Sequence, residues 1–237
     1  MMNDKIFKTT LVICHHAGGT SLPYRRWQPL LDRQLNIVVI DLPGRLTAIS
    51  EPVLEDINQI VKYVHNLCLP YLDTNLILYG HSMGGLIQYE YAKFLFQNYN
   101  KSAELLFITG CMAPSALEKA AHPFYKEQTD SEMLDAMASL LGDKPTFFQS
   151  NEMQYFLNLL RNDYQVIEKY KYEHIQMSCP IFIYIGDLDF FSNKKNTRAW
   201  SVETNNSCTI EALPGKHFFI FDSQNTQKII DKINFYV

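Results

Sequence analysis

A serine within residues 80–85, Gly-His-Ser-Met-Gly-Gly, is the first candidate for chemistry in this chain. An apolar run with strand character, residues 75–79, precedes it, and an apolar run compatible with a helix, residues 86–96, follows. Gly-x-Ser-x-Gly between a strand and a helix is typical of a nucleophile elbow, a sharp turn that exposes the serine hydroxyl. The N-terminus of the helix would supply N–H groups for a developing oxyanion. The pattern therefore predicts a nucleophilic Ser82.

An aspartate and a histidine follow Ser82 in the order expected for this architecture, Ser…Asp…His. Asp189 comes three residues after Gly186, where an apolar run ends, and His217 follows the last apolar run. A serine is a poor nucleophile until a base takes its proton, so His217 would act as base and then as acid. The aspartate would orient the imidazole and stabilise its charged form. The spacing favours Asp189 over Asp187, which stays open as the alternative.

A glycine-containing loop, residues 15–20, follows the first apolar run. In elbow hydrolases the loop after this early strand donates an N–H to the oxyanion. Ala17 is our candidate donor, because two glycines follow it and leave its amide accessible, although an ordinary turn explains the stretch equally well. Paired histidines can bind a metal, but no His, Asp or Glu stands nearby at ligand spacing. We therefore expect His15 and His16 to form a polar lining of this loop.

Composition limits the classes of protein that this chain can be. It has 237 residues, 47% hydrophobic and 19% charged, which suits one large α/β domain with a sizeable core. The formal net charge is −4 and there is no long block of Lys or Arg, so we expect no nucleic-acid partner.

Cysteine usage and hydropathy indicate the compartment. The five cysteines are odd in number, widely spaced and without a C-x-x-C pair, which favours free thiols in a reducing environment. The apolar run near the N-terminus is too short for a signal peptide, and no run approaches the ~20 residues that span a bilayer. We expect a cytoplasmic protein that does not enter a membrane.

Apolar runs and amphipathic stretches alternate along most of the chain. Strand, helix, strand, helix in this order predicts an α/β fold with a mainly parallel sheet and helices on both faces. The expected strands are residues 9–14, 36–40, 75–79, 104–110, 179–185 and 208–213, and the expected helices are residues 24–31, 55–69, 86–98 and 226–236.

Residues 115–177 lack a strong strand pattern. Residues 131–141, 151–160 and 161–172 each look helical. Because strands of one sheet bracket this long insert, we expect a helical lid over the carboxyl edge of the sheet; the alternative is an outer helical layer. The expected organisation is a single domain, residues 1–237, with a core of 1–114 and 178–237 and a lid of 115–177.

Arg45 follows an expected strand in the stretch Asp41-Leu42-Pro43-Gly44-Arg45, where Pro-Gly indicates a loop. An arginine here can reach the mouth of the site or an acidic partner. The other interpretation is an ordinary solvated loop charge.

The whole chain resembles the type II thioesterases that accompany nonribosomal peptide and polyketide synthases. The residues that carry the resemblance are Ala17-Gly18-Gly19, Asp41–Arg45, Gly80–Gly85, the segment from Phe156-Leu157 through Arg161-Asn162-Asp163-Tyr164, Cys179-Pro180-Ile181, Gly186-x-x-Asp189 and Gly215–Phe218. The chain departs from the family at His15-His16, where an apolar residue and a proline are usual, and at Leu46, where a glycine is common.

The resemblance implies an α/β-hydrolase fold and the hydrolysis of acyl thioesters on the phosphopantetheine arm of carrier proteins. Ser82 would attack the thioester carbonyl, and the backbone N–H groups of Met83 and Ala17 would hold the oxyanion. The pantetheine thiol would leave, and His217 would activate water to release the acid.

The expected partner is an acyl or peptidyl carrier protein domain of a synthase, which brings the pantetheine itself. We expect no metal and no dissociable cofactor, and a monomeric enzyme. One alternative is a carboxylesterase or lipase that acts on free esters with the same triad. A second alternative is a hydrolase scaffold retained as a binding module.

Overall fold

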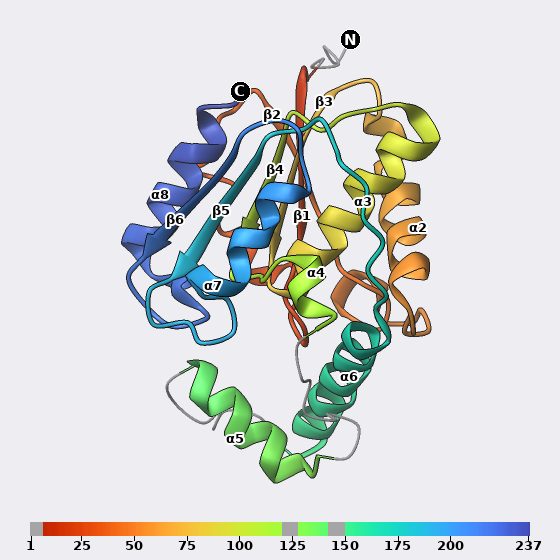
Figure 1. Cartoon of the computed structure of the whole chain (residues 1–237). Helices are drawn as coiled ribbons and strands as arrows, with labels where there is room; N and C mark the ends of the chain where they lie inside the picture. Colours follow the sequence, from red (N-terminus) through yellow and green to blue (C-terminus); the bar gives the residue numbers. More distant parts are fainter. Residues whose placement is uncertain (1–6, 120–127, 142–149) are drawn as a thin grey trace.

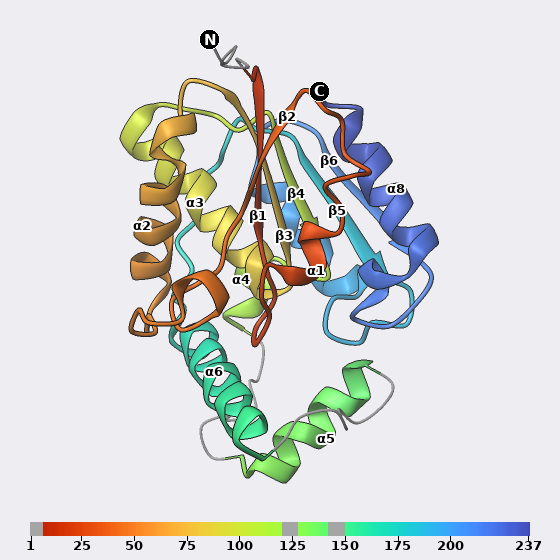
Figure 2. The same ribbon diagram turned by 180° about the vertical axis from the view of Figure 1, so that it is seen from behind.

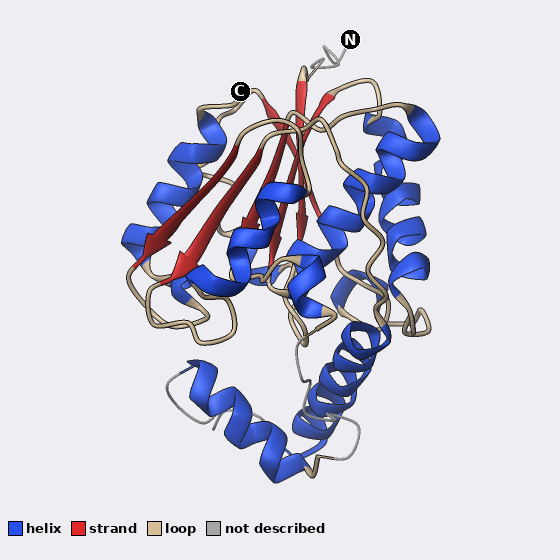
Figure 3. Cartoon of the chain, viewed as in Figure 1, coloured by secondary structure: helices blue, strands red, loops and turns tan. Residues whose placement is uncertain are grey.

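The computed structural model describes residues 7–119, 128–141 and 150–237. Its centre is a six-stranded sheet in the order β2-β1-β3-β4-β5-β6, and every pairing between neighbours in it is parallel (Figure 3). The predicted parallel α/β sheet is therefore confirmed. The strands are β1 (Thr9–Cys14), β2 (Leu35–Val39), β3 (Asn75–His81), β4 (Leu105–Thr109), β5 (Ile181–Gly186) and β6 (Cys208–Leu213).

Helices cover both faces of the sheet, as predicted. Helices α2 and α3 pack on one face, and α1 and α8 pack on the other (Figures 1 and 2). The helices are α1 (Leu22–Arg25), α2 (Ile57–Cys68), α3 (Met83–Tyr99), α4 (Pro114–Leu117), α5 (Asp130–Leu141), α6 (Ser150–Lys169), α7 (Lys194–Thr197) and α8 (Ser223–Asn234). Short 3₁₀ turns occur at Leu46–Ala48, Leu69–Tyr71, Arg198–Val202 and Phe219–Phe221.

The central strands are apolar on both faces, which explains their continuous hydrophobic runs. Along β3, Leu78 belongs to the cluster under α2 and α3, whereas Tyr79 belongs to the cluster under α8. In β4, Ile108 belongs to the cluster under α2 and α3 and Phe107 to the cluster under α8, and all four side chains are fully buried. Side chains that alternate between two covered faces leave little choice of register.

Glycine lets β3 and α3 come unusually close where one follows the other. A Cβ atom on Gly80 would lie 2.1 Å from the carbonyl oxygen of Gly84, and a Cβ on Gly84 would lie 2.2 Å from that of Cys14. Gln88 on α3 reinforces the contact, because its buried amide donates to the carbonyls of Val12 (2.9 Å) and Tyr79 (3.1 Å). The first turn of α3 is thereby fixed against the ends of β1 and β3.

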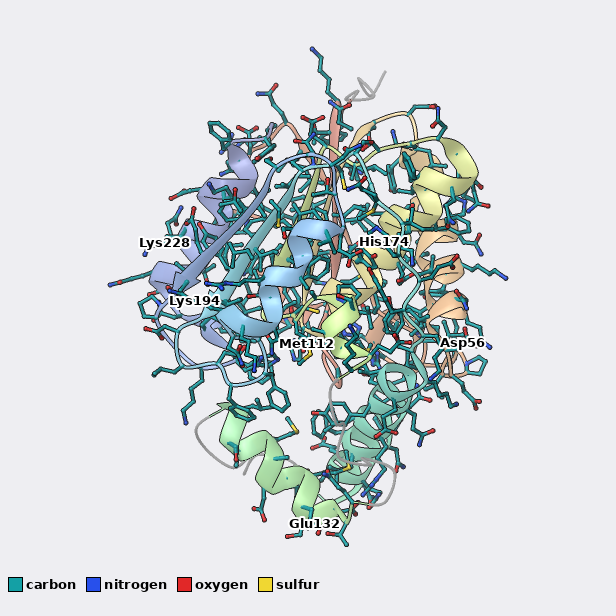
Figure 4. The ribbon with its side chains drawn as sticks, viewed as in Figure 1. Asp56, Met112, Glu132, His174, Lys194 and Lys228 are labelled. Carbon is teal, nitrogen blue, oxygen red and sulfur yellow. The ribbon has the colours of Figure 1, made fainter. Side chains whose placement is uncertain are left out.

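Helices α5 and α6 lie beyond the carboxyl ends of the strands (Figure 1), and Figure 4 marks Glu132 of α5 at the bottom of the view. In the described residues no strand lies between β4 and β5 apart from an isolated bridge of Met177 to Thr204. Residues 120–127 and 142–149 of the expected insert lie outside the described residues. The role of this insert as a lid stays a prediction.

Three expected helices differ from the structure. Helix α1 ends at Arg25 instead of continuing to Leu31, because Pro29 lacks an N–H and disfavours helical geometry at the residue before it. The turns that follow use short bonds such as Trp27 N–H to the Tyr24 carbonyl (3.0 Å). The expected helices 151–160 and 161–172 form one continuous helix, α6, since no glycine or proline interrupts it.

All five cysteines are free thiols, as the sequence predicts. Across the residues that the structure describes, no helix combines the length and the apolar character needed to cross a bilayer.

The contact between β3 and α3 predicts that alanine substitutions at Gly80 and Gly85 differ greatly in their effect on stability. Gly80→Ala should lower the free energy of unfolding by about 3 kcal/mol or more, because its methyl group meets fixed backbone. Gly85→Ala should cost about 1 kcal/mol, since its nearest contacts are side-chain carbons of Cys111 and Ile108 at 3.0 Å. Urea unfolding measures both; equal losses would contradict the tight approach at Gly80.

Candidate active site

Ser82 occupies a strained turn between β3 and α3. Its backbone angles are φ 55° and ψ −121°, a region that residues with a Cβ rarely adopt. Such strain costs about 1–3 kcal/mol and persists only where the surroundings enforce it. Here the Ser82 N–H donates to the Thr109 carbonyl (2.8 Å), and the Gly85 N–H donates to the Ser82 carbonyl (2.8 Å). The sequence therefore folds locally into the elbow that its glycines predict.

The structure brings His217 against Ser82. The imidazole Nε2 lies 3.0 Å from the Ser82 Oγ, and its Nδ1 lies 2.8 Å from the Asp189 Oδ2. A carboxylate has no proton to donate, so Nδ1 carries the proton and Nε2 presents a lone pair to the serine hydroxyl. This tautomer can accept the hydroxyl proton directly.

Asp189 is buried and fully hydrogen-bonded. Besides His217, it accepts from the Ser192 hydroxyl (2.6 Å) and the Phe191 N–H (2.9 Å). Burial alone would raise the pKa of Asp189, but the hydrogen bond and charge of His217, with those from Ser192 and Phe191, hold the pKa below its usual value. The carboxylate is therefore ionised at neutral pH.

The other candidate acid, Asp187, is exposed and makes a different contact. Its Oδ1 accepts the Gly215 N–H at 2.8 Å, which closes the loop that carries His217. The structure thus separates the two aspartates, with Asp189 on the imidazole and Asp187 on the neighbouring backbone.

In the Ala17-Gly18-Gly19 part of the loop after β1, two of the three N–H groups are donated. The Gly19 N–H donates to the His16 carbonyl (2.9 Å), and the Gly18 N–H donates to Asp163 (2.6 Å). In the described part of the chain, the Ala17 N–H has no acceptor, and neither has the Met83 N–H at the start of α3. Both predicted oxyanion donors therefore remain available to a ligand.

His15 holds the peptide that carries the Ala17 N–H. Its Nδ1 lies 2.8 Å from the His16 carbonyl, so Nδ1 must carry the proton, and Nε2 can accept the Leu42 N–H at 3.4 Å. Burial, followed by the charge of Arg45, lowers the pKa of His15 to about 3 although the bond to the His16 carbonyl opposes this. His15 is thus a neutral structural donor, consistent with the polar lining expected of this loop.

A mostly apolar cavity opens beside Ser82 and His217. It encloses about 650 Å³ of empty space, part of it open to solvent. The lining residues are Ser82, Met83, Leu86, Gly110, Cys111, Met112, Leu117, Leu140, Tyr164, Ile167, Phe191 and His217. Burial raises the pKa of the Cys111 thiol to about 12, so this neighbour stays protonated and does not compete as a nucleophile.

Two contributors to the site were not assigned a role from the sequence, and a third, Arg45, was left with two interpretations. Ser192 gave no signal, because a lone serine after a strand is common. Asp163 stood in a family motif without a role, yet its carboxylate contacts the loop of Ala17. Arg45 is not a solvated loop charge: its side chain is 1% exposed and pairs with Asp163 at 2.7 Å.

The arrangement has counterparts among known proteins. A family model described as "Thioesterase domain" matches residues 9–235. A relative from Brevibacillus parabrevis, named linear gramicidin dehydrogenase LgrE, is 30% identical over 217 residues, which cover 89% of this chain and 81% of the relative. Thioesterase TesA of Mycobacterium marinum is 28% identical over 235 residues, which cover 98% of this chain and 92% of the relative.

A solved structure extends the comparison to the fold. The type II thioesterase BorB from the borrelidin biosynthetic cluster is 26% identical, with a TM-score of 0.85, and the match covers 96% of this chain and 92% of BorB.

A parallel sheet whose elbow serine contacts a histidine, which in turn contacts a buried aspartate, is the arrangement of the α/β-hydrolase class. Within that class, the chain belongs to the thioesterase domain family, and it is an enzyme that hydrolyses thioesters.

The buried His15 makes stability depend on pH. In the unfolded chain its imidazole takes up a proton near pH 6.5, whereas in the folded protein it stays neutral down to about pH 3. The unfolded state therefore binds more protons between these values, so the stabilisation is present above pH 6.5 and is lost as the pH falls toward 3.

We expect the free energy of unfolding, measured with urea, to fall between pH 7 and pH 5, by up to ~1.4 kcal/mol per pH unit for each such histidine. The fall should be smaller in His15→Asn, which keeps an N–H donor for the His16 carbonyl. An identical fall in the variant would show that His15 does not contribute.

Proposed function

We propose that this protein is a type II thioesterase that removes acyl groups from the phosphopantetheine arm of carrier proteins in nonribosomal peptide or polyketide synthesis. The observation that carries the proposal is the contact chain Ser82–His217–Asp189 at the mouth of an apolar cavity, in a chain of the thioesterase family.

Acylation begins when the Ser82 Oγ attacks the thioester carbonyl and its proton passes to the His217 Nε2, 3.0 Å away. The negative charge on the carbonyl oxygen is held by the free N–H groups of Ala17 and Met83, each worth ~3 kcal/mol of barrier. The C–S bond then breaks, the imidazolium returns its proton to the sulfur, and the pantetheine thiol leaves. Asp189 stabilises the imidazolium throughout.

Deacylation reverses the roles. His217 takes a proton from water, whose oxygen attacks the acyl-serine carbonyl, and the same two N–H groups hold the second oxyanion. The proton then returns to the Ser82 oxygen and the free acid departs. Every proton in this scheme moves through one imidazole, so we propose that neither a metal nor a dissociable cofactor takes part.

Surface chemistry next to the site supports a carrier protein as the partner. Leu188 and Phe190 flank Asp189 with 68% and 61% of their surface exposed. The exposed Lys194 and Lys195 follow within a few residues, on α7 (Figure 4). An apolar patch edged by cations is complementary to a protein domain that carries negative charge.

Two other activities are less well supported. A dehydrogenase, the name given to one relative, would need a dinucleotide site, but no two glycines in this sequence stand two residues apart, so the motif G-x-G-x-x-G is absent. An esterase for free esters would use the same three residues, and only its substrate preference would distinguish it.

The two aspartates give a matched test of the mechanism. Asp189→Asn should lower kcat by about 10³- to 10⁴-fold, because the amide no longer favours the catalytic tautomer or the imidazolium. Asp187→Asn changes an exposed carboxylate on the Gly215 N–H and should alter kcat less than about 3-fold. Steady-state kinetics on a thioester decides; comparable losses would remove Asp189 from its proposed role.

Substrate choice tests the function itself. The same acyl group should be released faster from a carrier protein than from a free ester, measured as kcat/KM. Lys194→Glu/Lys195→Glu should slow the carrier reaction about 10-fold or more at low salt and leave the free ester unaffected.

The control for that variant is Lys8→Glu/Lys62→Glu, which makes the same change of charge at the amino end of the sheet and on α2. It should retain the carrier rate. A preference for the free ester would contradict the proposed function, and equal slowing by both double variants would contradict the location of the docking surface.

A further inference from the structure

Helix α6 packs directly against the loop that carries the Ala17 N–H. A Cβ atom on Gly18, whose φ is +67°, would lie 3.0 Å from a ring carbon of Phe156 and 3.1 Å from a methyl of Leu160. Ala17 itself packs on the small cluster that α5 and α6 form around Leu160. The loop therefore has little freedom to move toward or away from α6.

The carboxylate of Asp163 on α6 joins this helix to the loop of Ala17 and to Arg45. The Asp163 Oδ2 accepts the Gly18 N–H at 2.6 Å, and its Oδ1 accepts the Arg45 Nη2 at 2.7 Å. The side chains of Asp163 and Arg45 are each 1% exposed. A buried charge is retained where its hydrogen bonds are well made, and both oxygens of Asp163 are satisfied here.

These bonds hold both peptide units that flank Ala17. The peptide unit between His16 and Ala17 bears the Ala17 N–H. Its carbonyl, that of His16, accepts hydrogen bonds from the Gly19 N–H and from the His15 imidazole. The next peptide unit, between Ala17 and Gly18, donates its N–H to the Asp163 carboxylate. Because peptide units are planar, fixing both leaves the Ala17 N–H a single direction.

We propose that Asp163 is a positioning residue of the oxyanion site: its carboxylate holds the Gly18 N–H and so aims the Ala17 N–H at the developing oxyanion. Helix α6 then belongs to the fixed scaffold of the site. The inference rests on the proposed function, since an oxyanion forms only when Ser82 attacks a carbonyl.

Other contacts anchor α6 to the core without touching the loop of Ala17. The Asn162 amide donates to the Leu54 carbonyl at 2.8 Å, and the Tyr155 hydroxyl donates to the Gly44 carbonyl. Because Asn162 also hydrogen-bonds Asp163, the control is Tyr155, which lies on the same helix and, within the described residues, bonds only the Gly44 carbonyl.

The test is the separation of kcat from KM on a short p-nitrophenyl ester, with a carrier-bound thioester as the second substrate. Asp163→Ala should lower kcat about 10- to 100-fold with KM within about 3-fold, because an oxyanion contact acts only in the transition state. Tyr155→Phe, which removes a bond between α6 and the core away from Asp163, should keep kcat within about 3-fold of the parent enzyme.

A second variant separates positioning from stability. The Nε and Nη1 of Arg45 already lack partners among the described residues, so Asp163→Ala leaves this cation buried and unpaired. The Tm of the variant should therefore fall as well. Arg45→Met/Asp163→Leu removes both charges and should recover much of the Tm, yet kcat should stay low because the Gly18 N–H still lacks its acceptor.

The outcomes are distinct. Recovery of kcat together with Tm in the double variant, an unchanged kcat in Asp163→Ala, or an equal loss in Tyr155→Phe would each overturn the positioning role. Failure of the parent enzyme to hydrolyse either substrate would instead overturn the proposed function.

Discussion

The close approach of β3 to α3 under Ser82 is the constraint on which the site depends. Without side chains at Gly80 and Gly84, the strand and the helix meet backbone to backbone. The chain between them can then be held in the strained geometry of Ser82, with its N–H on the Thr109 carbonyl. The turn holds the Ser82 hydroxyl against His217 and is followed at once by the Met83 N–H, so the predicted nucleophile and the predicted oxyanion donor come from a single turn.

Electrostatics around Ser82 is simple because the neighbouring histidines stay neutral. Burial lowers the pKa of His15 to about 3 and that of His81 well below its ordinary value. The Asp189 carboxylate, by contrast, is held ionised next to His217. In the proposed mechanism, the proton released by Ser82 therefore has one well-placed acceptor, His217, whose charged form faces a fixed negative partner.

The sequence predicted the parts of this structure that follow from local chemistry. Alternating apolar runs and amphipathic stretches gave the parallel sheet, and the glycines around Ser82 gave the elbow. The distance of Asp189 from Gly186 favoured the aspartate that contacts His217. Each of these depends on the chain within a few residues, or on the general rule that the carboxyl ends of parallel strands meet at one edge of the sheet.

Contacts between distant segments were not predictable in the same way. Nothing near Arg45 in the sequence shows that it will be buried, because its partner Asp163 stands 118 residues later. Pairing across such a separation depends on how α6 packs on the loops at the carboxyl edge, which periodicity alone does not define. Ser192 is a different case, because it lies only three residues after Asp189 and its hydrogen bond depends on how that short loop turns.

The central claim is that an acyl group passes from a carrier-bound thioester to Ser82 and then to water. Rapid-quench mass spectrometry of the enzyme with one equivalent of acyl-carrier protein tests it most directly. We expect a transient gain in mass, equal to the acyl group and located on the peptide that contains Ser82, and no such gain in Ser82→Ala. Release of the acid at the parent rate by folded Ser82→Ala, or an acyl group carried on another residue, would contradict it.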